Sequence, residues 1–350
     1  MTAGLKPTTI RAPGMVTGMA AATYHAGDIT PEPALSSSLA VRMVEQCARV
    51  VWYAHPALNP RYQSEERGIY DLGSGAHARV LQPDEFRDMV EIVLAPDYRT
   101  KAAQVARDMA REAGRYPLLE HQVGDIEDMA AEIDGHPLAR LLMADGIAER
   151  SHFWIDRATG VWCKARPDWF VARDLCTPEI QRLCGWAEPG SFLLNYKTHG
   201  GATSPHAFAR HVGEMGYCQR GAWEMLGLQA TTGEMPDHYI LLVQETDPPY
   251  LVTAYELQRN DLEYGLSRNR EALAEFARCL SAGTDKSCWP GYRSAEQPGY
   301  DTLIPLELPA WKRMQLEDDR LRFLARSQAR KSTAKNIGAK SAEITRYYAP

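Results

Sequence analysis

One short apolar run of the sequence ends on an amide and a lysine, and an earlier apolar run carries an acid. The run that starts at Phe192 ends on Asn195 and Lys197, and an earlier run carries Asp168 directly after a proline. A Pro-Asp on one strand and an acid-x-Lys on the next would hold a divalent cation and an ammonium group against one phosphate. Position 195 has an amide where this pattern needs an acid.

Other residues could complete such a site. Mg²⁺ prefers hard oxygen ligands, and we consider Mn²⁺ as a substitute. Glu149 and Asp168 offer two carboxylates, and the backbone carbonyl of Tyr196 could offer a third oxygen. Lys197 could orient a water or stabilise developing charge. His77, from an earlier helix, could complete or orient the site.

Two further pairs of residues have a functional and a purely structural interpretation. Gln219 and Trp223 are four apart and therefore share a helical face, where they could hold a phosphate and pack against a sugar or base. Alternatively, Trp223 is a core residue and Gln219 a surface residue. Ser37 and Ser38 precede a periodic apolar run, so they could cap a helix or hold a DNA phosphate.

The elements that must position these residues can be placed from periodicity. A helix is expected from near Gly75, and two charged amphipathic helices within residues 98–147, broken around 114–117. A strand hairpin is expected over 148–155 and 161–171, and the segment 172–190 is an apparent insertion before a strand at 191–197. A helix (205–228), two strands (238–244 and 251–257) and a helix (261–280) follow. This order predicts an α/β fold with a mixed central sheet and flanking helices.

Bulk properties set loose bounds. The chain has 350 residues, 45% of them apolar, which is enough for a full core. The net charge of -6 means that any nucleic-acid contact must come from a local patch. The seven cysteines include no C-x-x-C pair, which argues against a disulfide framework or zinc knuckle. With no apolar leader or membrane span, we expect a cytoplasmic protein.

The two ends of the chain differ in composition from the middle. Residues 1–23 are rich in Gly, Pro, Thr and Ala, which is typical of a flexible leader. Residues 314–350 form a basic tail that includes Arg326, Arg330 and Lys331. Such a tail is usually a solvated helix or a disordered arm, and in a DNA enzyme it could follow phosphates.

Taken in order, these motifs resemble a known family. The segments that carry the resemblance are Tyr24–Gly27, Leu72–His77, Leu81–Phe86, Ala148–Glu149, Gly160–Asp168, Tyr196–Thr198 and Gln219. Together they resemble the C-terminal nuclease domain of exonuclease VIII (RecE), a member of the PD-(D/E)XK superfamily. The resemblance runs from residue 24 to about 313, with 172–190 as the insertion.

The resemblance implies a magnesium-dependent exonuclease that degrades one strand of linear double-stranded DNA from its 5′ end. The 3′ overhang would pass to a single-strand annealing protein, and the enzyme would be a homo-oligomer, often a tetramer. His77, Glu149, Asp168, Lys197 and Gln219 match the family's active-site positions. Position 195 is where the family has its second metal-binding aspartate.

The amide of Asn195 has a chemical consequence. An amide oxygen can ligate Mg²⁺, but it brings no negative charge. The sequence therefore predicts low or absent cleavage with duplex binding retained. The alternative is a catalytically inactive DNA-end-binding or recombination scaffold. An unrelated hydrolase is disfavoured because the sequence contains neither a G-x-S-x-G elbow nor an H-E-x-x-H pair.

Overall fold

The computed structural model describes residues 10–63, 69–292 and 306–326. By contacts the chain divides into one unit, Met1–Tyr292, and a second unit, Arg293–Pro350. The division comes earlier than the domain end expected near residue 313. All elements below belong to the first unit, except one helix over residues 310–326.

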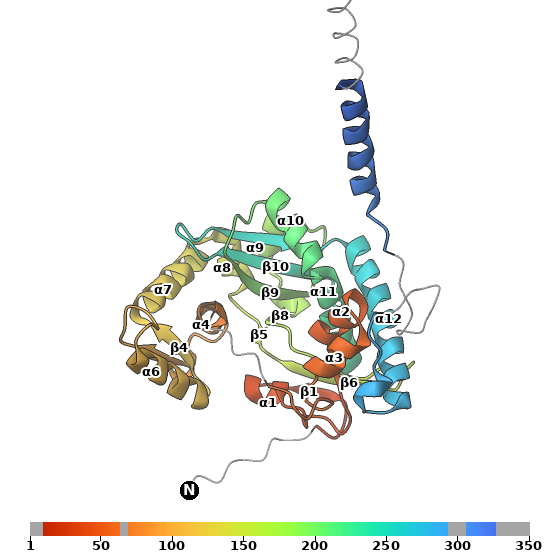
Figure 1. Cartoon of the computed structure of the whole chain (residues 1–350). Coiled ribbons are helices and arrows are strands. Elements are labelled where there is room, and N and C mark those ends of the chain that lie inside the picture. The colour runs from red at the N-terminus through yellow and green to blue at the C-terminus, as the bar shows by residue number, and fades with distance from the viewer. Residues whose placement is uncertain (1–9, 64–68, 293–305, 327–350) are drawn as a thin grey trace, which may run out of the picture. The chain divides into compact units, whose positions relative to one another are not determined.

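A mixed five-stranded sheet forms the centre of the first unit (Figure 1). Its order is β11-β10-β9-β8-β5, with β9 and β10 parallel and the other neighbours antiparallel. The strands are β5 (Ile147–Ala148), β8 (Trp169–Val171), β9 (Phe192–His199), β10 (His238–Glu245) and β11 (Val252–Glu256). The predicted α/β class and mixed central sheet are confirmed.

The expected hairpin is present, but it belongs to a different sheet. Strands β6 (Ser151–Ile155) and β7 (Trp162–Ala165) pair antiparallel within a four-stranded sheet of order β1-β6-β7-β2. The chain leaves this sheet after Ala165 and enters the central sheet at Trp169. Pro167, which has no N–H to donate, lies in this connection, and Asp168 follows it. Asp168 therefore lies where the chain passes from one sheet to the other.

Part of the expected flexible leader is ordered. Strand β1 (Gly14–Val16) pairs antiparallel with β6, and the short helix α1 (Ala21–His25) follows it. Met19 and Tyr24 are buried against Phe153 in a small apolar cluster. The prediction of a flexible leader is thus wrong for residues 10–23, and residues 1–9 lie outside the described part of the chain.

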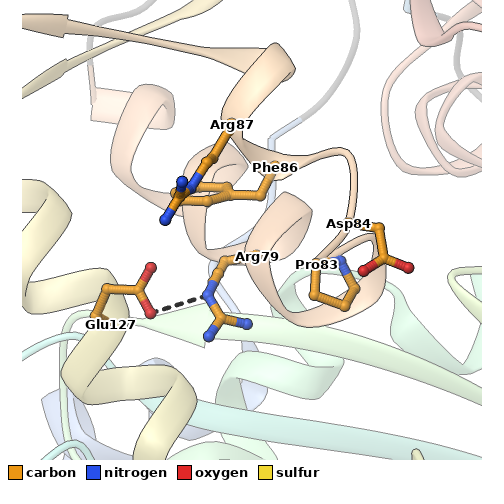
Figure 2. Close-up of a pocket in the computed structure, with 6 residues that line it drawn as sticks. All are labelled: Arg79, Pro83, Asp84, Phe86, Arg87 and Glu127. Atoms are coloured by element: carbon orange, nitrogen blue, oxygen red, sulfur yellow. Dashed lines mark hydrogen bonds and ion pairs between the residues drawn. The ribbon is translucent and has the colours of Figure 1, made fainter.

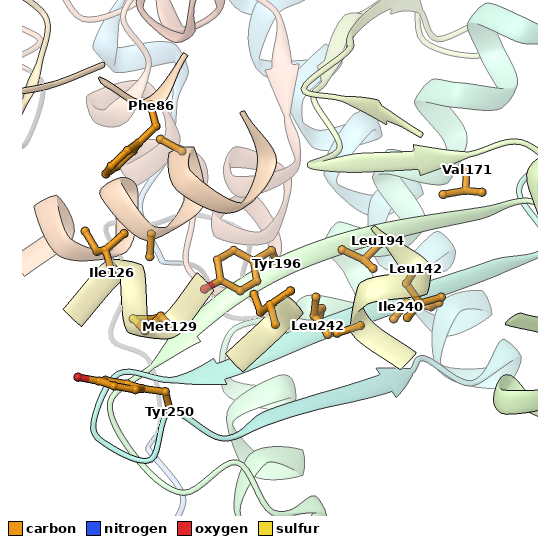
Figure 3. Packing of buried hydrophobic residues seen from close by; sticks show 14 of the residues in the cluster. Phe86, Ile126, Met129, Leu142, Val171, Leu194, Tyr196, Ile240, Leu242 and Tyr250 are labelled. Atoms are coloured by element: carbon orange, nitrogen blue, oxygen red, sulfur yellow. The ribbon is translucent and has the colours of Figure 1, made fainter. Parts of the chain in front are cut away.

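Alternation along β9 divides the core into two layers. Phe192, Leu194 and Tyr196 point to one face of the sheet. On that face pack α4 (Ile69–Leu81), α7 (Glu120–Gly135), α8 (Pro137–Leu142) and α9 (Pro178–Cys184). Figure 3 shows Tyr196 and Leu194 of β9 among Ile126, Met129 and Leu142 of these helices.

The other face of β9 carries Leu193, and beyond it Asn195 and Lys197 follow the same alternation. Helices α10 (Pro205–Glu214) and α11 (Tyr217–Thr232) cover this face through Phe208 and Leu228. The prediction of a single helix over 205–228 is therefore wrong. The chain forms two helices that meet near Gly216, which has a φ of 63°.

The predicted start of α4 is also corrected. The helix begins at Ile69, so Gly73 and Gly75 lie inside it. A Cβ on Gly75 would lie 2.8 Å from Ile126 and 3.0 Å from Leu118, so glycine here permits close packing on α7 and the strand before it.

The expected pair of helices within 98–147 is more finely divided than predicted. Helix α5 (Phe86–Met89) precedes a two-stranded parallel sheet of β3 (Val90–Val93) and β4 (Tyr116–Leu119), with α6 (Lys101–Glu112) between the strands. Helices α7 and α8 follow, separated at His136.

The remaining helices form a separate layer beside the four-stranded sheet. They are α2 (Ser37–Glu45), α3 (Ala48–Ala54) and α12 (Arg259–Ala282), with β2 (Leu35–Ser36) leading into α2. Phe276 and Trp289 are fully buried in this layer. The segment 172–190 folds as a 3₁₀ turn (Arg173–Leu175) and α9, with Cys176 and Ile180 in the core. A second 3₁₀ turn (Lys286–Cys288) follows α12.

In the second unit, residues 310–326 form a helix whose side chains are almost all exposed. Throughout the described part of the chain, every helix is too short or too polar to cross a membrane.

Candidate active site

Three side chains from separate elements converge at the junction of the two sheets. His77 comes from α4, Glu149 from the connection between β5 and β6, and Asp168 from the connection between β7 and β8. One ligand atom from each lies within 4.8 Å of the others. His77 Nε2 is 3.2 Å from Asp168 Oδ2, and its Nδ1 is 3.5 Å from Glu149 Oε1. Among the described residues these three form a group that could hold a metal ion.

Glu149 is held by its backbone and by an arginine. Its φ of 52° lies in the left-handed region, which costs a non-glycine residue about 1 kcal/mol or more. Its backbone N–H donates to Asp168 O at 3.0 Å, and its carboxylate accepts from the Arg166 guanidinium. Arg166 is anchored in turn on Met19 O. This strained backbone aims Glu149 toward His77.

Asp168 accepts donors from the end of β9. The backbone N–H of Tyr196 donates to its Oδ2 at 2.9 Å, and Lys197 Nζ donates to the same atom at 3.2 Å. Lys197 Nζ also donates to the carbonyl of Tyr196 at 3.1 Å. The structure thus brings Lys197 and the Tyr196 carbonyl to Asp168, while the Tyr196 ring packs on the opposite face of the sheet.

The electrostatics of the two acids differ. Burial favours a raised pKa for Asp168, but Lys197 and His77 outweigh it and lower the pKa to about 2. Burial, and then the charge of Asp168, raise the pKa of Glu149, against the opposing charges of His77 and Arg166. Asp168 is therefore a fixed anion, whereas Glu149 is an acid that a nearby cation would stabilise in its ionised form.

Asn195 is buried beside an acid that was not among the predicted site residues. Its Nδ2 donates to Glu224 of α11, at 3.2 Å to Oε2 and 3.4 Å to Oε1. Tyr239 of β10 donates its hydroxyl to Glu224 Oε2 at 2.7 Å. The sequence held one signal for Glu224: with Tyr217 and Arg220 it forms a helical face at spacings of three and four, distinct from the face of Gln219 and Trp223.

A cleft of about 1870 Å³ lies over this site, and the buried Asn195 is not among the residues that line it. His77, Glu149, Asp168, Lys197 and Glu224 all lie on its surface. Ser37 and Ser38, at the first turn of α2, line the same cleft. Ser36 is the N-cap residue of α2, but its side chain makes no capping hydrogen bond and lies 3.3 Å from the Ser38 hydroxyl.

A smaller hollow of about 660 Å³ lies between α4 and α7 (Figure 2). Arg79 Nε on its wall is 3.0 Å from Glu127 Oε2, and both side chains are partly exposed. Asp84 and Arg87 lie at its rim. Its charges are of mixed sign and partly paired, so it lacks the converging acids of the larger cleft.

Two predicted residues on α11 lie away from the cleft surface. Trp223 is fully buried in the core, and its indole donates to Lys164 O at 3.0 Å. The prediction that Trp223 packs against DNA is therefore wrong, and its core interpretation holds. Gln219 is only 5% exposed, so it is not the surface residue of the alternative interpretation. Its Nε2 is buried without a hydrogen-bond partner in the described structure.

The predicted basic tail is described only in part. Arg326 is exposed at the end of the helix over 310–326, and Arg330 and Lys331 lie outside the described residues.

The donor set suits a hard divalent cation. Carboxylate and carbonyl oxygens from Asp168, Glu149 and Tyr196 are the ligand type that Mg²⁺ prefers, and the imidazole of His77 is a type that Mn²⁺ also accepts. Asn195 Oδ1 is buried with no hydrogen-bond partner among the described residues. A cation would satisfy such an orphaned oxygen.

Comparison with known proteins gives one useful likeness. No protein-family model and no curated protein matches the chain. The crystal structure of a protein named "Putative exonuclease" from Eubacterium rectale matches 84% of this chain and 97% of its own, with a TM-score of 0.52 and 12% sequence identity. The two chains share a fold. It is the mixed α/β fold described above. The structure of SSO0001 covers 57% of this chain at 13% identity, but its TM-score of 0.23 is too low to support an argument.

Proposed function

We propose that this protein is a metal-dependent deoxyribonuclease that degrades linear double-stranded DNA from its ends. The observation that carries the proposal is the convergence of His77, Glu149 and Asp168, with Lys197 on Asp168, inside one cleft. The fold shared with the protein named "Putative exonuclease" from Eubacterium rectale supports the reaction class.

Asp168, Glu149, Tyr196 O and Asn195 Oδ1 would hold the cation, which we propose to be Mg²⁺, with Mn²⁺ as a substitute. When bound, the cation offsets charge on the phosphate and lowers the pKa of water. Lys197, fixed by Asp168 and the Tyr196 carbonyl, is placed to stabilise charge on a phosphate oxygen. His77 bridges both acids and can hold or move a proton at either ring nitrogen.

The finer assignment rests on the sequence resemblance to exonuclease VIII. The resemblance implies 5′-to-3′ digestion of one strand, which leaves a 3′ overhang. It also implies a homo-oligomer and a single-strand annealing protein as partner. Ser37 and Ser38 support a DNA-binding role for the cleft, because the backbone N–H groups of an uncapped helix start can donate to phosphate.

A digestion assay on duplexes labelled at opposite ends tests the proposal. With Mg²⁺, we expect release of the 5′ label first, stable 3′-labelled overhangs, and no nicking of closed circles. Asp168→Asn should abolish cleavage, and the exposed Asp174→Asn on the 3₁₀ turn before α9 should not. Endonucleolytic nicking of circles would overturn the exonuclease assignment, and equal activity of Asp168→Asn would overturn the site.

Asn195 favours a second candidate, a DNA-end-binding scaffold without catalysis. That protein would bind duplex ends and show no cleavage with Mg²⁺ or Mn²⁺. Its end binding would be insensitive to Asp168→Asn, because no cation would mediate it.

A further inference from the structure

A buried carboxylate lies next to the amide that breaks the nuclease pattern. Glu224 is 7% exposed on α11, and it lines the same cleft as Asp168 and Lys197. Asn195 and Tyr239 both donate hydrogen bonds to it. Strand β9 and helix α11 thus place a carboxyl group within hydrogen-bonding distance of position 195.

The contacts of Glu224 leave its charge unpaired. Its hydrogen-bond partners are the neutral amide of Asn195 and the neutral hydroxyl of Tyr239, and it forms no ion pair with another described residue. A buried carboxylate with only neutral partners is unfavourable unless a cation lies near it. A purely structural contact between β9 and α11 would not need a carboxylate.

We propose that Glu224 is a cation-binding residue of the site, and that it supplies from α11 the negative charge that Asn195 lacks on β9. The inference rests on the proposed function and deepens it, because Glu224 would complete the metal site that Asn195 leaves short of one negative charge. Glu224 lies outside the compact group of His77, Glu149 and Asp168. Asn195 links it to strand β9, whose next two residues, Tyr196 and Lys197, donate to Asp168. Asn195 then has two roles: its Nδ2 positions Glu224, and its buried Oδ1 has no hydrogen-bond partner among the described residues that would compete with a cation.

A calorimetric titration of the full-length protein with Mn²⁺, carried out without DNA, measures the Mn²⁺ affinity on which this role depends. Glu224→Gln keeps a side chain of the same shape that can still accept from Asn195 and Tyr239. We expect it to weaken Mn²⁺ binding about 10- to 100-fold, while the unfolding temperature without metal stays the same or rises. Tyr239→Phe is the matched control: it removes one hydrogen bond to Glu224 but leaves the charge, so binding should change much less.

An exchange of charge between positions 195 and 224 gives a second test. Asn195→Asp combined with Glu224→Gln moves the carboxylate from helix to strand, and we expect Mn²⁺ affinity and Mg²⁺-dependent cleavage to return close to the original values. Asn195→Asp alone places two carboxyl groups in contact, so one must hold a proton near neutral pH and the gain in affinity should be small.

The outcomes separate this inference from the proposed function. If Glu224→Gln binds Mn²⁺ as tightly as the original chain while Asp168→Asn does not bind, Glu224 is structural and the inference is wrong. A double variant that binds as weakly as Glu224→Gln would also overturn it. If the original chain and Asp168→Asn bind Mn²⁺ equally, the proposed metal site itself fails.

Discussion

At the scale of single residues, Asp168 organises the site. It receives the Tyr196 N–H, Lys197 and His77 on one carboxylate oxygen. Lys197 and His77 explain why its pKa falls although it is buried. The arrangement also makes Lys197 serve two purposes, since it neutralises Asp168 and remains on the cleft surface.

Lys197→Met should therefore impair chemistry more than binding. Removing one group that stabilises charge in the transition state costs about 10²- to 10³-fold in rate. We expect a loss of this size in the single-turnover cleavage rate, with duplex affinity within a few-fold of the original. Lys101→Met, at the exposed start of α6, is the control and should leave the rate unchanged. A rate for Lys197→Met close to that of the control would contradict the assigned role.

At the scale of elements, α11 is held where it reaches the site by its packing on α12. A Cβ on Gly265 of α12 would lie 2.4 Å from the backbone carbonyl of Cys218 in α11. Asn269 of α12 donates to Gln219 O at 3.0 Å, one helical turn further along. The two helices can approach this closely only because position 265 has no side chain.

Gly265→Ala should push α11 away from α12 and so displace Glu224. Because the obstacle is backbone, we expect a loss of about 2 kcal/mol or more in the free energy of unfolding and weaker Mn²⁺ binding. Gly213→Ala in α10 is matched to it, because its Cβ would meet nothing within 4 Å. That control should be neutral or more stable by up to about 1 kcal/mol. Urea unfolding of both variants measures the difference, and equal stabilities would refute the packing argument.

The elements also show what could be read from the sequence. Strands β9, β10 and β11 and helix α12 follow long, regular patterns and were predicted nearly to their ends. The start of α4 was missed because Gly73 and Gly75 normally break helices, and only their packing partners in β4, α7 and β9 explain them. Likewise Pro167 separates two sheets that a hairpin pattern places in one.

In the candidate site, too, the residues with a local sequence pattern were predictable, and those that depend on a distant partner were not. His77, Glu149, Asp168 and Lys197 carry types and spacings that suggest convergence, and the structure does bring them together. Glu224 was not predicted because its meaning depends on Asn195, which lies 29 residues earlier in the chain. Trp223 was assigned to DNA because an aromatic residue at helical spacing fits a binding face and a core position equally well.

At the scale of the whole molecule, stability and DNA affinity are expected to reside in different parts of the chain. The described apolar clusters lie entirely within Met1–Tyr292, with Trp289 as their last member. The described residues of the second unit form an exposed helix with Arg320, Arg322 and Arg326.

A chain that ends at Tyr292 should keep its unfolding temperature and bind duplex DNA with a weaker dependence on salt. For every phosphate that the basic tail no longer neutralises, the slope of log affinity against log salt becomes shallower by about 0.9. Binding titrations at several salt concentrations measure the slope, and an unchanged slope would show that the basic tail does not bind DNA.

The fold also contains histidines that must stay neutral. His55 and His152 are buried, and burial lowers the pKa of each from 6.5 to about 4. The unfolded chain takes up protons below about pH 6.5 that the folded chain does not. Stability is therefore full above that pH and is lost as pH falls toward 4, by up to about 3 kcal/mol per histidine.

Urea unfolding at about pH 7 and about pH 5 should show this loss. His152→Gln should have a shallower pH dependence than the original chain, because it removes one of the histidines whose pKa is lowered by burial. Parallel pH profiles for the two proteins would contradict the assignment.

The origin of the three converging side chains has a consequence for the order of folding. His77, Glu149 and Asp168 come from a helix and from connections at the junction of two separate sheets. Neither sheet alone contains the site, so it exists only after both have docked. Cation binding should therefore appear last during refolding, after the far-ultraviolet circular dichroism signal has recovered. For the same reason it should be the first property to disappear when the protein is mildly destabilised, which makes it a sensitive report of native assembly.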